Sequence, residues 1–345
     1  MKYNPLISIL SVVLLTGCGG SGSSEKSQGA AEPKDKIIES KNIEKAEFEP
    51  LPFPDVQIPS IISDQQEALA YYSQNFWNGI TDPSRDYPCD SLYVSGVPKD
   101  VVEQKFADWT MLLDAAPLEI ALKSMENLYD GAYECEKKNP SSNVFETFVQ
   151  LVQKYLYDPN SPVRNEEYYL PFVSRYASYE GLSDVERGKY EREARMCGLN
   201  RIGTKATDFR FSDKSGKIRN LHDIDSELTL LFFSNPGCSA CMSIIEVLKG
   251  DQNISSLISS GKMAVLNIYI DEDIQAWRSY MPIYPEEWYN GFDPDLVLRG
   301  DDVYAIRAIP SLYLLDAEKR VIMKDVPENK LFNYLISYIG TGSYL

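Results

Sequence analysis

Residues 228–245 of the chain read LTLLFFSNPGCSACMSII. The segment begins with a continuous apolar run of strand length, breaks at an Asn-Pro-Gly turn, and then places Cys238 and Cys241 at the start of a helical pattern. Cysteines three positions apart on a helix lie about one turn from each other, which is close enough for a disulfide bond. A Cys-x-x-Cys pair between a strand and a helix therefore predicts thiol–disulfide chemistry.

The two cysteines should differ in reactivity. Cys238 falls at the expected helix start, where free backbone N–H groups and the helix dipole stabilise a thiolate. Cys241 lies one turn further into the helix and should be less exposed. We predict that Cys238 is the attacking nucleophile and that Cys241 is the resolving thiol. An inert disulfide is one alternative, although so short a loop gains little stability. Half of a zinc site is the other, although the chain has one histidine and no second Cys-x-x-Cys.

Three motifs, taken in order, resemble the thioredoxin-like superfamily, and in particular its extracytoplasmic thiol–disulfide oxidoreductase branch. Residues 203–209 match the Gly-x-x-Ala-x-x-Phe opening of that branch, the cysteine pair follows, and residues 308–316 match its cis-proline loop and the next strand. The resemblance implies an α/β thioredoxin-like sandwich over residues 199–345. It also implies an inserted helix and strand ahead of the proline loop.

The resemblance further implies roles for two residues of the proline loop. Pro310 would adopt the cis form beside the cysteine pair, since X-Pro bonds become cis far more readily than other peptide bonds. The backbone of Ile309 would pair with an extended substrate peptide, which is a form of strand addition. Without the resemblance, a proline before a strand is typical of a turn or a sheet edge.

Two positions depart from the family pattern. Phe232 stands where many thioredoxins carry a buried Asp that accepts a proton, and Gly237 replaces the Trp before the first cysteine. Proton transfer at Cys241 must then use another group or water. The candidates for this proton transfer are three acidic residues after the next predicted strand, namely Asp271, Glu272 and Asp273. The alternative interpretation is that these residues form a solvated loop and a helix cap. Asn235 occupies the place of a Thr found in related peroxidases, which argues against peroxidase chemistry.

Residues 1–18 have the pattern of a processing signal. A lysine precedes an apolar run over residues 6–15, which is too short to span a bilayer. Leu15-Thr16-Gly17-Cys18 then resembles the lipobox of bacterial lipoproteins, which implies cleavage before Cys18 and lipid attachment to that cysteine. An ordinary secretory signal is the alternative. Gly19 rather than Asp follows, which in the resembling proteins favours the outer membrane.

Residues 19–59 are rich in Gly, Ser, Pro and charged side chains, a composition that predicts a disordered tether. Residues 60–198 carry apolar positions at helical spacing and predict an all-α domain with an aromatic core. Residues 155–169 resemble part of a helical domain of unknown function that precedes thioredoxin-like domains in lipoproteins of Gram-negative bacteria. Substrate docking or dimerisation is the alternative role of the aromatic stripes. Two pairs have capping-box spacing, namely Ser63 with Gln66 and Ser183 with Glu186.

The helical region also contains an odd number of cysteines, namely Cys89, Cys135 and Cys197. At most one disulfide can form among these three, and its connectivity does not follow from sequence. Buried free thiols are the simplest interpretation. A Cys89–Cys135 disulfide remains open, as does thiol exchange between Cys197 and the Cys238 dithiol.

Composition narrows the function. The chain has 345 residues, which suggests about two domains plus a tether, and its net charge of −17 argues against a nucleic-acid partner. A single histidine leaves little room for a metal centre, and we expect no cofactor. We predict an exported, lipid-anchored thiol–disulfide oxidoreductase of the cell envelope. Its substrates would be protein thiols and disulfides, and a membrane-bound thiol donor would reduce it. The alternative is a binding or assembly lipoprotein that uses the thioredoxin-like fold as a scaffold.

Overall fold

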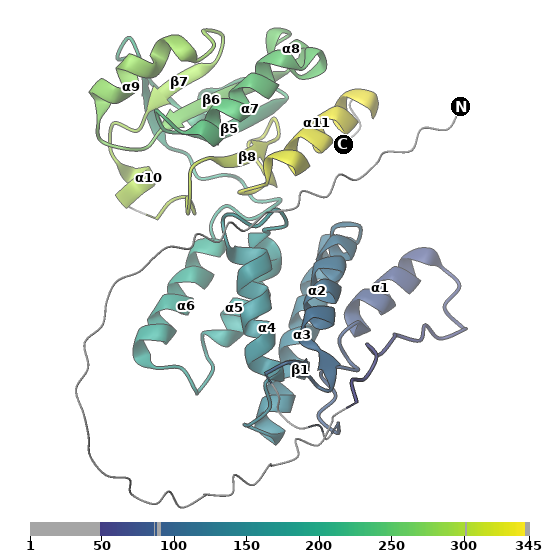
Figure 1. Ribbon diagram of the computed structural model, residues 1–345. Coiled ribbons are helices and arrows are strands. Elements are labelled where there is room, and N and C mark those ends of the chain that lie inside the picture. Colours follow the sequence, from purple (N-terminus) through teal and green to yellow (C-terminus); the bar gives the residue numbers. More distant parts are fainter. Residues whose placement is uncertain (1–48, 86, 88–90, 301, 342–345) are drawn as a thin grey trace, which may run out of the picture. The chain divides into compact units, whose positions relative to one another are not determined.

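The structure is a computed structural model that describes residues 49–341 except 86, 88–90 and 301. The predicted signal, the lipobox with Cys18, and Cys89 lie outside the described residues. Residues from Glu49 onward form one compact unit. Within this unit, helices come first in the chain and a mixed sheet follows (Figure 1).

The helical part is built on an aromatic core. Trp77 packs edge-on against Trp109 and Phe148, and its ring also contacts Phe106. These rings are almost fully buried, so the predicted aromatic stripes are core residues. The helices are α1 (Gln65–Asn75), α2 (Lys99–Asp114), α3 (Leu118–Lys138), α4 (Val144–Val152), α5 (Glu166–Tyr176) and α6 (Asp184–Cys197), with a π-helical turn at Gln153–Tyr157. One short hairpin, β1 (Tyr93–Val94) with β2 (Val97–Pro98), adds to the predicted helices.

The helix starts test the capping predictions. Ser183 and Glu186 form the predicted capping box at α6. The prediction for Ser63 and Gln66 is wrong, because α1 is capped by Asp64, whose carboxylate accepts from the N–H groups of residues 66 and 67. Asp64 follows Ser63 directly and can cap the same free N–H groups. A prediction from capping-box spacing alone therefore put the cap one residue too early.

The C-terminal part is a mixed sheet in the strand order β4-β3-β7-β6-β5-β8-β9. Strands β5, β6 and β7 are parallel to one another, whereas β3, β4, β8 and β9 join by antiparallel pairing. The bounds are Arg210–Asp213 (β3), Ile218–Asn220 (β4), Leu228–Phe233 (β5), Met263–Tyr269 (β6), Tyr289–Phe292 (β7), Ser311–Leu315 (β8) and Val321–Met323 (β9). This is the expected thioredoxin-like sandwich. The inserted helix α9 (Ile274–Tyr280) and strand β7 lie where the resemblance placed them.

Helices cover both faces of this sheet. Apolar side chains of α7 (Ser239–Gly250), α8 (Gln252–Ser259) and α11 (Glu328–Thr341) pack on the face that carries Leu228, Leu230 and Phe232. The opposite face of the sheet packs against α10 (Val297–Gly300). Two short 3₁₀ turns lie at Leu221–Asp223 and Met281–Ile283. Within the described residues, no helix is both long and apolar enough to cross a bilayer.

Candidate functional site: the dithiol and the cis-proline loop

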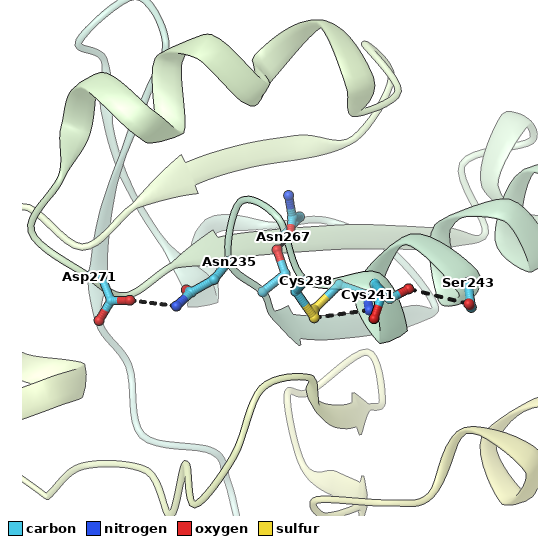
Figure 2. The surroundings of a disulfide bond; sticks show 8 residues. Asn235, Cys238, Cys241, Ser243, Asn267 and Asp271 are labelled. Carbon is cyan, nitrogen blue, oxygen red and sulfur yellow. Dashed lines mark hydrogen bonds between the residues drawn. A yellow bond between two sulfur atoms is a disulfide. The ribbon is translucent and has the colours of Figure 1, made fainter.

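Cys238 and Cys241 are joined by a disulfide at the start of α7, with their Cα atoms 5.2 Å apart. Cys238 is the N-cap residue of the helix, and its Sγ accepts a hydrogen bond from the backbone N–H of Cys241 at 3.1 Å (Figure 2). Cys241 is only 2% exposed, whereas Cys238 is partly exposed. The predicted difference in exposure is confirmed. The N–H that points at Cys238 is suited to stabilise negative charge on that sulfur after reduction.

The turn before Cys238 has its own constraints. Gly237 has a φ of +79°, a left-handed conformation that disfavours any side chain with a Cβ, which is why a Trp does not fit this turn without strain. Asn235 donates a side-chain hydrogen bond to the carboxylate of Asp271 (Figure 2). Asp271 also pairs with Arg299. Asp271 therefore fixes the turn that leads to Cys238.

The two other acidic residues considered for proton transfer, Glu272 and Asp273, have structural contacts instead. Asp273 caps helix α9 by accepting from two backbone N–H groups, which confirms the cap interpretation. Glu272 pairs with Arg299 on the surface. Phe232 is fully buried, and polar groups beside it in the sheet form a neutral chain, in which Ser234 donates to Asn267. Asn267 then donates to Asn290 at 3.1 Å.

The Ile309–Pro310 peptide bond is cis, as the resemblance implied. Strand β8 begins at the next residue, Ser311, which pairs with Phe233 at the end of β5. The proline loop therefore lies beside the turn that carries the cysteines, and Ile309 and Cys238 pack against the same core cluster. Among the described residues, the backbone of Ile309 has no hydrogen-bond partner.

A cavity of about 400 Å³ adjoins this loop. Ala240, Ile244 and Val247 of α7 line one side of it, and Ile309 with Pro310 lines another. Phe332 of α11 also lines it, as do three residues of the helical part, Pro159, Asn160 and Arg164. We call this cavity the dithiol groove. It borders the cysteine pair through Ala240, which lies between Cys238 and Cys241 in the sequence.

A buried cluster of charges lies behind the proline loop. Glu166, at the start of α5, accepts from Nε of Arg307 at 2.8 Å and pairs with Nζ of Lys324 at 2.9 Å. Asp325 accepts from Nη2 of Arg307 at 2.7 Å and from Oγ of Ser311 at 2.8 Å. The side chains of Glu166 and Lys324 are 1% exposed, Asp325 is 5% exposed and Arg307 is 12% exposed.

Arg164 joins this cluster by donating to the backbone carbonyls of Asp325 at 3.1 Å and Val326 at 3.3 Å. We call Arg164, Glu166, Arg307, Lys324 and Asp325 the junction cluster. Burial raises the pKa of Glu166, against the opposing effect of Lys324 and Arg307. The cluster joins the helical part directly to the residues on either side of the cis-proline.

The two other cysteines in the described part of the chain are not part of this site. Cys135 and Cys197 are free, buried thiols, as the simplest interpretation predicted. Burial raises the pKa of Cys135 to about 11 and raises that of Cys197 further. Cys197 is 0% exposed, so the structure offers it no route to exchange with the Cys238 pair. Since Cys135 is a free thiol, the alternative of a Cys89–Cys135 disulfide is not supported.

A family model described as Domain of unknown function (DUF5106) matches residues 23–199. A thioredoxin-like protein from Bacteroides caccae is 33% identical to this chain with a TM-score of 0.71, over 83% of this chain and 98% of that one. The chain belongs to the DUF5106 family and is thioredoxin-like in its C-terminal part. A search of curated proteins gives no match.

Two further crystal structures match the thioredoxin-like part of this DUF5106 protein. One is the C-terminal domain of an uncharacterized protein from Bacteroides fragilis, which is 42% identical over 40% of this chain and 98% of that one, with a TM-score of 0.39. The other is the thioredoxin domain of a thiol-disulfide oxidoreductase from Bacteroides vulgatus, 20% identical over 40% of this chain and 98% of that one, with a TM-score of 0.35.

Sequence reasoning did not find the junction cluster of this DUF5106 protein. Asn165 followed by two glutamates is a readable helix start, and Asn165 does cap α5 by accepting from the N–H groups of residues 167 and 168. Acidic residues in a first turn are usually exposed, so nothing local signals that Glu166 is buried. Its cationic partners lie more than 140 positions away in the sequence.

Proposed function

We propose that this protein is an exported, lipid-anchored thiol–disulfide oxidoreductase that exchanges disulfides with substrate proteins. The supporting observation is the Cys238–Cys241 disulfide at a helix start beside a cis-proline loop. A loop this short gains little stability from a disulfide, which favours a redox role for the pair. The two features together support a redox-active sulfur beside a backbone segment that binds a peptide.

In the reductive direction the pair begins as a dithiol. The Cys238 thiolate attacks one sulfur of a substrate disulfide, and a mixed disulfide forms while the other substrate sulfur leaves as a thiolate. Cys241 then loses its proton to solvent and attacks the Sγ atom of Cys238. The substrate is released as a dithiol and the Cys238–Cys241 disulfide forms. Two electrons have passed from the enzyme to the substrate, and a membrane-bound thiol donor restores the dithiol.

Each residue has a separate task in this proposal. The N–H of Cys241 and the helix dipole stabilise negative charge on the Cys238 sulfur after reduction. The cis bond at Pro310 turns the chain so that the backbone of Ile309 faces the bound peptide, with which it pairs as an added strand. Lipid attachment at Cys18, proposed from the lipobox alone, would hold the enzyme at the outer membrane while residues 19–59 act as a tether.

A redox titration against glutathione tests the redox part of this proposal. The Cys238–Cys241 pair should titrate as one two-electron couple, in which a tenfold change in the equilibrium corresponds to about 30 mV. The Cys135→Ala variant is the control and should titrate at the same potential, because this thiol is buried elsewhere. If the pair stays oxidised in excess reduced thiol, the exchange activity is wrong and the alternative of a thioredoxin-like scaffold is favoured.

Trapping tests the order of events. A Cys241→Ala variant should accumulate mixed disulfides with partner proteins, because the releasing thiol is absent. A Cys238→Ala variant should accumulate none. Equal trapping by both variants would contradict the assigned roles.

The lipid anchor is tested separately. A Cys18→Ala variant should leave the membrane fraction, and its retention there would contradict the lipid anchor.

A further inference from the structure

The helical part contributes one side of the dithiol groove. Pro159, Asn160 and Arg164 lie in the segment between the π-helical turn and α5, and they line the groove together with α7, the proline loop and Phe332. We call these three residues the helical wall. A thioredoxin-like domain alone would leave this side of the groove open to solvent.

The helical wall is fixed in place by interactions on both sides of it. Arg164 donates to the carbonyls of Asp325 and Val326, and two residues further on Glu166 binds Arg307 and Lys324. Displacing the wall would break the hydrogen bonds of Arg164 and disturb the buried contacts of Glu166 with Arg307 and Lys324, and breaking a buried ion pair is strongly destabilising. Within its own segment, the Ser161 hydroxyl donates to the carbonyl of Tyr155 at 2.6 Å. The wall is therefore a preorganised surface.

The character of the groove indicates its occupant. Ile244, Val247 and Phe332 give it an apolar lining, and the exposed carboxylate of Glu328 lies at its border. The backbone of Ile309 has no partner among the described residues, and a polypeptide satisfies such groups by adding a strand. A small disulfide needs only access to the Cys238 sulfur. An extended polypeptide segment is long enough to reach across the groove to the helical wall.

We propose that the helical wall is a specificity determinant, which binds the polypeptide segment next to the substrate disulfide and so selects protein disulfides over small ones. This inference rests on the exchange activity proposed above. Asn160 is the residue to vary, because it lines the groove and is exposed. Among the described residues, its side-chain amide donates only to the carboxylate of Asp158, two positions away.

The experiment compares two disulfides with wild type and an Asn160→Trp variant, with dithiothreitol as the reductant. The bulky indole should occupy the groove and raise KM for insulin reduction by about tenfold with kcat little changed. The rate constant kcat/KM for hydroxyethyl disulfide should stay within about twofold of the wild-type value. Asn78→Trp is the matched control, since Asn78 is also an exposed asparagine of the helical part but lies outside the groove.

The outcomes separate the two proposals. If the wild type reduces neither disulfide, the exchange activity itself fails. If the wild type reduces both and Asn160→Trp leaves KM for insulin unchanged, the helical wall has no part in substrate binding and this inference is wrong. An equal loss on both disulfides, or an equal change in the Asn78→Trp control, would also overturn it. A rise in KM confined to insulin and to Asn160→Trp supports it.

Discussion

The cis-proline loop is bordered by two very different clusters. On one side is the Cys238–Cys241 pair, whose members lie three positions apart and whose geometry comes from a single helix start. On the other side is the junction cluster, whose members come from the helical part, the loop before β8 and the end of β9. The dithiol is local in the sequence and is the group to which we assign chemistry, whereas the junction cluster is assembled from distant residues and holds parts of the chain together. The comparison shows that one loop can lie between a pair set by nearby sequence and a cluster set by tertiary contacts with the helical part.

Cysteine reactivity should show the largest contrast. Burial raises the pKa of Cys135 to about 11, so only about one thiol in ten thousand is ionised there at pH 7. The reduced Cys238 lies at a helix N-terminus and is partly exposed. We expect iodoacetamide to modify Cys238 at least about a thousandfold faster than Cys135 at pH 7. Mass spectrometry of tryptic peptides measures both rates in one sample.

The pH dependence of these rates sharpens the test. Alkylation of Cys135 should keep rising up to a pH of about 11, because its raised pKa keeps the thiol protonated at neutral pH. Alkylation of Cys238 should level off at a much lower pH, because its thiolate is stabilised. Similar rates and similar pH profiles for the two cysteines would remove the distinction between a reactive and a structural thiol.

Removing a carboxylate from the junction cluster should have the next largest effect. The Glu166→Ala variant removes the carboxylate that Lys324 and Arg307 share. Arg307 then keeps only Asp325 as an ion-pair partner and Lys324 keeps only backbone carbonyls, so we expect a loss of about 3–5 kcal/mol in the free energy of unfolding. Urea unfolding of the full chain measures it. Glu191→Ala on α6 removes an exposed glutamate and should change stability by less than about 0.5 kcal/mol. Equal losses of stability in the two variants would mean that the junction cluster does not hold the helical part to the thioredoxin-like part.

A smaller loss is expected for Ser311→Ala. The buried Ser311 hydroxyl donates to the Asp325 carboxylate, and hydrogen bonds to charged groups contribute about 1.5–3 kcal/mol. Ser212→Ala is the matched control, because that buried hydroxyl donates only to a neutral carbonyl at 3.4 Å. Chemical unfolding should rank Ser311→Ala clearly above Ser212→Ala. The reverse order would contradict a structural role for the bond behind the proline loop.

The smallest effect should come from Lys330→Ala. Lys330 of α11 pairs with Asp114 of α2 at 2.6 Å, so it also joins the two parts of the chain. The side chains are 26% and 34% exposed, and solvent screens their attraction. We expect a loss of less than about 1 kcal/mol, measured by the same unfolding assay. A loss as large as that of Glu166→Ala would show that burial does not explain why one ion pair contributes more stability than the other.

Much of the thioredoxin-like part was predictable. The strand–turn–helix around Cys238 follows from the apolar run, the Asn-Pro-Gly turn and the helical pattern after it. The cis form of Pro310 came from the family resemblance, since most X-Pro bonds are trans. The cap at Ser63 was misplaced because two neighbouring residues could serve equally well. The roles proposed for Cys238, Cys241 and Ile309 remain predictions.

The sequence by itself determined the dithiol, because the two sulfurs and the helix start that activates one of them lie within a few bonded residues. It also determined which segments are helices and strands, through the periodicity of their apolar side chains. Only the tertiary structure decided that Glu166 is buried, that Arg307 and Lys324 meet it, and that Asn160 lines the groove. Those contacts join residues that are far apart in the chain, and the free energy that brings them together comes from the hydrophobic cores rather than from any local pattern.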